Sequence, residues 1–239
     1  MNEWRGAKRL ARALRALANR CPRLRPLLPA AVIVASWPAC HVGEDPLVVF
    51  LGDSLTSGWR LSEDEAWPAL VGRTLAARHR PIQVLNAGVS GDTVAQGLAR
   101  LPDVLARRPD VLVVALGVND GLRGLPLEGV EAGLRRILEE GRAAGSRLLL
   151  VGVRLPPRDG VDRARRFEQI FVRLAAEQQV ALVPDLLAGV AGHPEFLFRD
   201  GLHPNAPGHL RLAENVRPPL EHVLAGLEGF PPSTPDPAR

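Results

Sequence analysis

Short apolar runs alternate with longer amphipathic segments along the chain from Pro46 onward. The runs have the length of buried β-strands and cover Leu47–Leu51, Ile82–Leu85, Val111–Leu116, Leu148–Val153 and Ala181–Val183. Strands that are apolar along their whole length are typical of a parallel sheet covered on both faces. The alternation therefore predicts an α/β domain.

The segments between these runs have apolar residues three and four positions apart, which is the spacing of one helix face. They predict helices over Trp67–Arg80, Thr93–Arg107, Leu127–Ala144 and Asp162–Gln178, and a last helix over Pro207–Leu227. Five parallel strands joined by crossover helices predict a three-layer, flavodoxin-like α/β fold. Such folds bind ligands beyond the carboxyl ends of their strands.

Length and composition fit one hydrophobic core, since the chain has 239 residues of which 46% are hydrophobic. We expect a basic N-terminal extension over residues 1–45, one domain over residues 46–228 and a Pro-rich tail over residues 229–239. No internal repeat is evident, and we expect a monomer.

Positive charge is concentrated in the extension. Residues 1–45 contain eight Lys and Arg residues and three acidic residues, whereas the whole chain has a formal charge of only +4. The domain that follows is therefore close to neutral and gives no electrostatic footprint for a phosphate backbone. We expect no nucleic-acid partner.

Three interpretations of the extension stay open. The basic region followed by the apolar run Ala30–Ala35 has the order of a secretory signal, although no clean small-residue cleavage site follows. Apolar residues at helical spacing from Trp4 to Leu17, opposite a row of arginines, are typical of a helix on an anionic membrane surface. The third interpretation is a disordered leader or a start codon placed too far upstream. A periplasmic or envelope-associated location and a cytoplasmic one are thus both open.

The two cysteines, Cys21 and Cys40, also lie in the extension, so the domain has neither a disulfide nor a thiolate metal site. The best apolar stretch, Leu27–Ala39, contains two prolines and is shorter than the roughly 20 residues that span a bilayer. The sequence therefore predicts no transmembrane anchor.

The first apolar run ends in Gly52-Asp53-Ser54-Leu55, which puts a serine at the first strand-to-helix turn. A nucleophile there would lie at the open edge of the sheet, beside helix-start N–H groups that stabilise an anion. Asp and Ser are also common helix N-caps, and this fragment alone favours a cap.

Hydrogen-bond donors follow the second and third runs. Gly91 lets a backbone N–H approach a ligand closely, and Asn119 offers a side-chain amide at the same edge of the sheet. Donors of this kind are what a tetrahedral oxyanion requires. Ordinary turn chemistry explains each of them when it is taken alone.

A histidine with an acidic partner follows the last strand, in Asp200-Gly201-Leu202-His203. A carboxylate three residues before an imidazole can orient it and leave its other nitrogen free to take a proton from a serine. The other five histidines lack an acid at this spacing or lie in the extension or in helical patterns, so we interpret them as surface or packing residues.

Taken in order, these four fragments resemble the four sequence blocks of the SGNH or GDSL hydrolases. The resemblance covers about residues 46–225. Further matches at Gln96–Pro102, Asn119–Gly124 and Arg154–Pro156 are similar to the bacterial thioesterase I, arylesterase and lysophospholipase L1 group. Close relatives in that group usually have Gly-Gly-Asn-Asp in the third block, where this chain has Val118, and a β-branched residue restricts the loop there.

The resemblance implies a serine esterase, thioesterase or lysophospholipase that acts on small acyl esters or thioesters without a metal or other cofactor. It implies Ser54 as nucleophile, His203 as general base and acid, and Asp200 as the carboxylate that orients His203. The implied oxyanion donors are the backbone N–H groups of Ser54 and Gly91 and the side-chain amide of Asn119. We predict further that four apolar residues contact the substrate: Leu122, Leu125, Leu155 and Phe198.

Three other functions are alternatives to this one. A receiver-like phosphate switch depends on a lysine, and the chain has none beyond Lys8. An inactive, lipid-binding SGNH domain stays open, although all four blocks are intact. A carbohydrate O-deacetylase also stays open, because fold and triad do not distinguish sugar esters from lipid esters.

Overall fold

The computed structural model of the protein describes residues 45–156 and 160–230. The predicted extension, apart from Asp45, and the tail from residue 231 onward lie outside the described residues, and so do Cys21 and Cys40. In the described part of the chain, no helix is long and apolar enough to cross a membrane.

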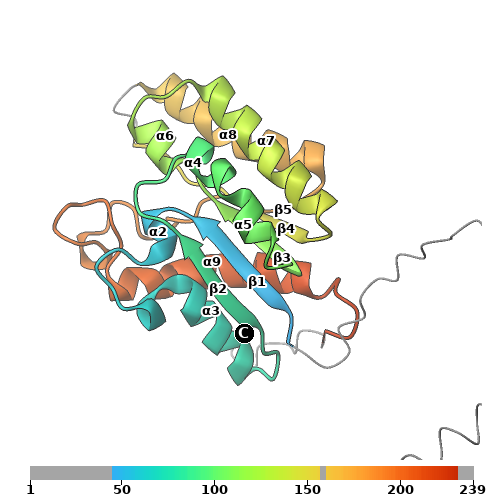
Figure 1. Cartoon of the computed structure of the whole chain (residues 1–239). Helices are drawn as coiled ribbons and strands as arrows, with labels where there is room; N and C mark the ends of the chain where they lie inside the picture. Colours follow the sequence, from blue (N-terminus) through green and yellow to red (C-terminus); the bar gives the residue numbers. More distant parts are fainter. Residues whose placement is uncertain (1–44, 157–159, 231–239) are drawn as a thin grey trace, which may run out of the picture. The chain divides into compact units, whose positions relative to one another are not determined.

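Five parallel strands form one sheet in the order β2-β1-β3-β4-β5 (Figure 1). Their bounds are β1 Leu47–Gly52, β2 Gln83–Gly88, β3 Val111–Ala115, β4 Arg147–Val151 and β5 Ala181–Val183. In the register, Val49 of β1 pairs with Leu85 on one side and with Leu112 on the other. The sheet confirms the predicted α/β fold with five parallel strands.

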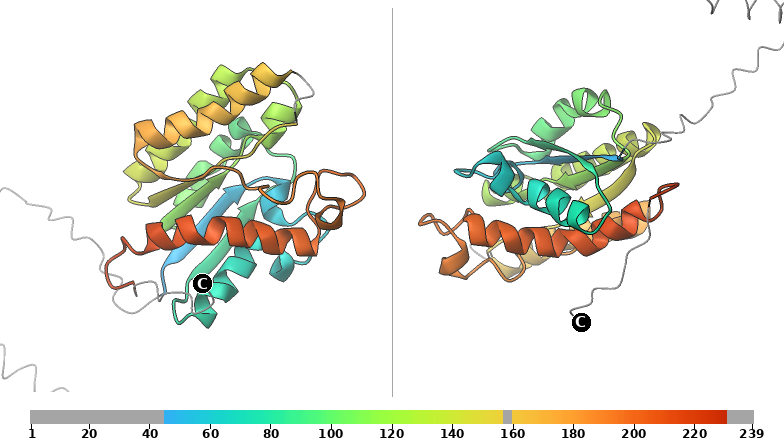
Figure 2. Two further views of the ribbon diagram at one scale, coloured as in Figure 1. Left: turned by 180° about the vertical axis from the view of Figure 1, so that it is seen from behind. Right: turned by 90° about the horizontal axis from the view of Figure 1, so that it is seen from below.

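Helices cover both faces of this sheet (Figures 1 and 2). On one face α3 packs against α9, and on the other α7 packs against α4 and α8. The long helices are α3 Trp67–Ala77, α7 Leu127–Ala143, α8 Val161–Gln178 and α9 Ala206–Leu224. They match the predicted helices to within a few residues at each end, as expected where helix ends fray.

The core lies between the sheet and these helices. Every residue of β3 is buried, and so are Val48 to Gly52 of β1, because helices cover these central strands on both faces. Apolar helix residues such as Leu134, Ile137 and Phe167 are fully buried against them. The loops at the carboxyl edge of the sheet therefore rest on a packed and rigid base.

The predicted helix over Thr93–Arg107 is interrupted. The structure has α4 Val94–Ala99 and α5 Leu101–Leu105, which meet at Arg100. Pro102 is the second residue of α5, and a proline at that position cannot donate a hydrogen bond back into the preceding turn. Arg100 is thereby placed at the corner between the two short helices.

Two further short helices follow the central strands directly: α2 Ser54–Ser57 comes after β1, and α6 Val118–Leu122 comes after β3. In the sheet, β2 lies on one side of β1 and β3 on the other, so the direction of winding reverses at β1. The crevice of a doubly wound fold opens at such a point, here between α2 and α6. Short 3-10 helices, η1 Glu63–Glu65 and η3 Pro194–Phe196, lie within the connecting segments before α3 and α9.

Candidate active site

The first strand delivers Ser54 to the carboxyl edge of the sheet, where it is the first residue of α2. The Asp53 carboxylate accepts a hydrogen bond from the backbone N–H of Leu55 (3.0 Å) and caps this helix. A Cβ at Gly52 would clash with the hydroxyl of Thr56, so this tight turn requires glycine. Ser54 is only 7% exposed, and its position is therefore fixed by the strand and the helix.

A tight loop before α9 holds His203. The Phe198 N–H donates to the His203 carbonyl (2.8 Å), and Gly201 turns the chain between them with φ 66°. The Asp200 carboxylate accepts hydrogen bonds from the backbone N–H groups of Leu202 and His203, both at 3.0 Å. The three-residue spacing thus lets the carboxylate fold back onto the histidine's own backbone.

The structure brings the predicted acid, imidazole and alcohol into one hydrogen-bonded chain. The Nδ1 atom of His203 lies 2.9 Å from Oδ2 of Asp200, and its Nε2 lies 3.0 Å from Oγ of Ser54. Ser54 and His203 are 149 positions apart in the sequence. Both distances are within hydrogen-bonding range, which is the geometry that proton transfer requires.

The negative charge of Asp200 favours the imidazole tautomer of His203 whose proton is on Nδ1. Burial opposes ionisation of Asp200, but hydrogen bonds from the His203 and Leu202 backbones and from the imidazole lower its pKa to about 2. The ionised carboxylate accepts the proton of Nδ1, which leaves the lone pair of Nε2 facing the Ser54 hydroxyl.

The predicted oxyanion donors lie around the same serine. Gly91 turns with φ 88° and, with Asn119, lines the cleft that contains Ser54 and His203. The Asn119 amide donates one N–H to the Asp92 carbonyl (2.9 Å), which fixes the side chain and leaves its second N–H available. Within the described residues, the backbone N–H groups of Ser54 and Gly91 have no hydrogen-bond partner.

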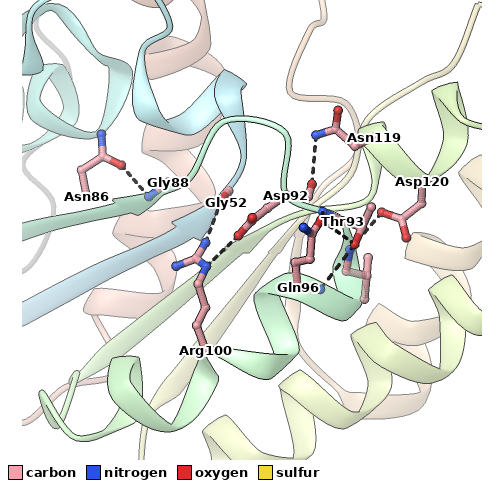
Figure 3. A network of polar contacts seen from close by, with 10 residues as sticks. Gly52, Asn86, Gly88, Asp92, Thr93, Gln96, Arg100, Asn119 and Asp120 are labelled. Carbon is pink, nitrogen blue, oxygen red and sulfur yellow. Dashed lines mark hydrogen bonds and ion pairs between the residues drawn. The ribbon is translucent and has the colours of Figure 1, made fainter.

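A network of polar contacts supports the turn after β2 (Figure 3). Thr93 and Gln96 form a capping box at the start of α4, and the Asp120 carboxylate accepts the Val94 N–H (2.9 Å). Farther along, Arg100 binds the Asp92 carboxylate (2.7 Å). The segment that carries Gly91 is therefore tied to α4 and to the start of α6.

The cleft beside Ser54 encloses about 280 Å³. Four of the residues predicted to act chemically line this cleft: Ser54, Gly91, Asn119 and His203. Its other lining residues are Leu55, Trp59, Ser90, Val118, Leu122 and Leu202. A cleft with an apolar lining and a few convergent polar groups is typical of a small-molecule site.

The four predicted apolar contacts take different positions. Leu122 lines the cleft, and together with Leu155 it lines an adjoining pocket of about 90 Å³. Leu125 is 36% exposed, and Phe198 places its ring edge-on to that of Trp59, 6.1 Å between centroids. In the described part of the chain, neither of these last two lines the cleft or the adjoining pocket.

Sequence reasoning missed Trp59. Its indole stacks on the imidazole of His203, with 4.2 Å between ring centroids and 29° between planes. The guanidinium carbon of Arg60 lies 4.1 Å from the centroid of the same indole. The available signal was an aromatic residue five positions after Ser54, in the loop that leaves the nucleophile turn.

Buried acidic groups surround the serine turn. Burial raises the pKa of Asp53 to about 7, and burial also raises the pKa of Asp120.

Among residues 45–156 and 160–230, no group of three or more His, Cys, Asp or Glu side chains is placed to hold a metal ion.

The family of the chain follows from comparison with known proteins. Residues 50–211 match the model of the GDSL-like lipase/acylhydrolase family. The chain belongs to this family, and it is an ester or thioester hydrolase of the GDSL type.

Individual relatives are similar over most of their length. The chain is 42% identical over 178 residues to thioesterase 1/protease 1/lysophospholipase L1 of Escherichia coli strain K12, covering 74% of this chain and 84% of that one. It is 36% identical over 190 residues to an arylesterase of Vibrio mimicus, covering 79% and 94%. The crystal structure of TesA superimposes with a TM-score of 0.72 at 38% identity, covering 74% of this chain and 99% of that one.

Proposed function

We propose that the protein hydrolyses carboxylic esters and thioesters through an acyl-enzyme on Ser54, with His203 as general base and acid and Asp200 as its orienting carboxylate. The observation that carries this proposal is the unbroken chain from Asp200 Oδ2 through the imidazole to Ser54 Oγ, at 2.9 and 3.0 Å. A serine hydroxyl is a weak nucleophile until an adjacent base accepts its proton.

In the first half of the reaction, the Ser54 oxygen forms a bond to the acyl carbon while Nε2 of His203 takes the hydroxyl proton. The imidazolium that results faces Asp200, whose pKa of about 2 keeps it ionised and able to stabilise the positive charge. Collapse of the tetrahedral intermediate breaks the bond to the alcohol or thiol, which leaves with the proton of His203. The acyl group stays on Ser54.

In the second half, water occupies the place of the leaving group. The water oxygen attacks the acyl carbon while Nε2 of His203 accepts one of the water's protons. The same proton then passes to the Ser54 oxygen as the carboxylic acid departs. Each half uses the same Nε2 atom of His203, which takes a proton first from Ser54 and then from water, so the loop before α9 does not need to rearrange between the two halves.

The negative charge of both tetrahedral intermediates would be stabilised by three N–H donors. They are the backbone N–H groups of Ser54 and Gly91, which have no other partner among the described residues, and the second N–H of the Asn119 amide. Donors that are already fixed cost no reorganisation when charge develops, which is why such sites accelerate acyl transfer.

The walls of the cleft suggest how a substrate lies. The leaving group receives its proton from His203 and therefore departs on the side of Trp59 and Leu202. The acyl chain would then extend past Leu122 toward the adjoining pocket that Leu155 lines. We propose small and lipid-like acyl esters and thioesters as substrates. The names of the relatives, an arylesterase and a thioesterase/lysophospholipase, support this class.

A panel of substrates tests this proposal and separates it from the O-deacetylase alternative. Initial rates are measured on an aryl acetate, a long-chain acyl-CoA, a lysophospholipid and acetylated xylan, with Ser54→Ala as the matched control. We expect turnover of the aryl ester and the acyl thioester, little on acetylated xylan, and none with Ser54→Ala. Turnover of acetylated xylan alone would replace the proposal with the deacetylase, and no turnover of any substrate would indicate an inactive domain.

A further inference from the structure

We propose that Arg100 is a positioning residue that holds the oxyanion-binding turn in register with the nucleophile turn, an inference that rests on the function proposed above. Its guanidinium makes two hydrogen bonds to two different segments. Nε donates to Oδ2 of Asp92 at 2.7 Å, and Nη2 donates to the backbone carbonyl of Gly52 at 2.9 Å (Figure 3). One planar group thereby joins the last residue of β1 to the turn after β2.

Each end of this bridge adjoins a group that touches the reacting atoms. Gly52 lies two residues before Ser54 at the end of β1. Asp92 directly follows Gly91, and its carbonyl accepts the amide of Asn119 (2.9 Å). Arg100 thus bonds one residue that lies two positions before Ser54 and another residue that adjoins Gly91 and bonds Asn119. Arg100 itself does not line the cleft.

The surroundings make this bridge stiff. The Arg100 side chain is 23% exposed and the Asp92 side chain 9%, so water competes weakly for their charge-assisted hydrogen bond. A guanidinium fixes two donors in one plane, whereas a lysine ammonium is a single point charge on a flexible stem. Lysine can keep the charge near Asp92 but cannot reproduce the two-segment geometry.

Helix α4, which ends directly before Arg100, is itself anchored to the site. The capping box of Thr93 and Gln96 defines the start of α4 (Figure 3), and the Asp120 carboxylate accepts the Val94 N–H. The break at Pro102 ends α4 at the point from which the guanidinium reaches both segments. The backbone of Arg100 is therefore held in place by contacts other than those that its side chain makes to the two segments it joins.

Loss of the bridge is expected to affect catalysis more than substrate binding. Oxyanion donors must match the transition state within a fraction of an ångström, and a displacement of about 1 Å can cost on the order of a hundredfold in rate. Ground-state contacts in the cleft come from other side chains, such as Leu122 and Trp59. The signature is a fall in kcat with KM nearly unchanged.

The test compares Arg100→Lys and Arg100→Ala with Arg107→Ala, an exposed arginine seven positions farther along. In the full chain, we measure kcat and KM on an aryl acetate, the labelling rate of Ser54 by a fluorophosphonate, and thermal unfolding. We expect both Arg100 variants to lose about tenfold to a hundredfold in kcat and in labelling rate, with KM within about twofold. Millimolar guanidinium ion is expected to restore part of the kcat of Arg100→Ala and to leave Arg107→Ala unchanged.

Other outcomes would overturn the proposal. Folded Arg100→Lys with the kcat of the unmodified protein would overturn it, and so would a loss that tracks only the unfolded fraction and shows no rescue by guanidinium. If both Arg100 variants fail to fold, Asp92→Asn removes the charge from the pair and leaves the bond to Gly52, and full kcat in that variant would overturn the proposal. Failure of the proposed function itself is distinguishable, because Ser54→Ala would then retain turnover.

Discussion

The indole of Trp59 and the imidazole of His203 lie stacked, with 4.2 Å between their ring centroids. The guanidinium carbon of Arg60 lies 4.1 Å from the same indole centroid, so the indole contacts a cationic side chain as well as the imidazole. The plane of His203 is consequently set by a stacked ring, while its two nitrogens are set by Asp200 and Ser54.

Replacing Trp59 tests the contribution of this stacking. Aromatic pairs are worth about 0.5–1.5 kcal/mol beyond area burial, so we expect Trp59→Ala to lower kcat/KM on an aryl acetate by about threefold to tenfold. Trp59→Phe keeps an aromatic face and is expected to recover most of this loss. Equal activity of Trp59→Ala and the unmodified protein would show that the stacking does not orient His203.

Replacing Asn119 tests the oxyanion site. Asn119→Ala removes a donor that is already fixed by the Asp92 carbonyl, and we expect kcat to fall by about a hundredfold to a thousandfold with little change in KM. Ser90→Ala is the matched control, because Ser90 lines the same cleft but bonds the hydroxyl of Ser57 (3.1 Å). A loss of the same size in both variants would assign the effect to the cleft as a whole.

His209 gives the fold a calculable dependence on pH. Burial lowers its pKa from 6.5 to about 4, and its Nδ1 accepts the Trp67 backbone N–H at 3.1 Å. A depressed histidine pKa contributes stability that is fully present above about pH 6.5 and is lost as the pH falls toward 4. Between pH 7 and pH 5 this contribution is expected to shrink by about 2 kcal/mol.

The measurement is urea unfolding of the protein and of His209→Gln at pH 7 and pH 5. The difference between the two proteins is the relevant quantity, because Asp53 acts in the opposite sense. Its pKa is raised from 3.8 to about 7, so its contribution to stability grows as the pH falls from 7 toward 4. Parallel pH dependence in the two proteins would contradict the assignment of His209 as a neutral buried acceptor.

The sheet was predictable because its central strands are apolar along their whole length, as in β3, where every residue is buried. Residue types and spacing also singled out Asp200 and His203, since a carboxylate three residues before a histidine can fold back on its own loop. The Ser54 fragment taken alone favoured a helix cap, and its role as nucleophile was implied only by the family resemblance. The contact of Ser54 with His203, 149 positions away, was inferred only through the expected fold and the family resemblance.

Other parts of the site depend on loop geometry, which the spacing of apolar residues along the sequence does not predict. Trp59, whose indole stacks on His203, lies between two residues with left-handed backbone, Gly58 with φ 75° and Arg60 with φ 63°. Arg100 reaches two segments because Pro102 breaks what the apolar spacing predicted as one helix. Leu125 and Phe198 are apolar residues near the sequence blocks, as is Leu122, and spacing alone did not distinguish Leu122, the last residue of α6, as the one that lines the cleft.

The proposed hydrolysis depends on the activation of Ser54 as a nucleophile by His203. Intact-mass analysis after treatment with a fluorophosphonate measures this most directly, with labelling rates followed for the protein, Ser54→Ala and His203→Ala. We predict one adduct per chain, located on Ser54 by peptide mapping, absent in Ser54→Ala and slowed at least about a hundredfold in His203→Ala. Labelling of folded Ser54→Ala at the original rate, or an adduct on another residue, would contradict the account.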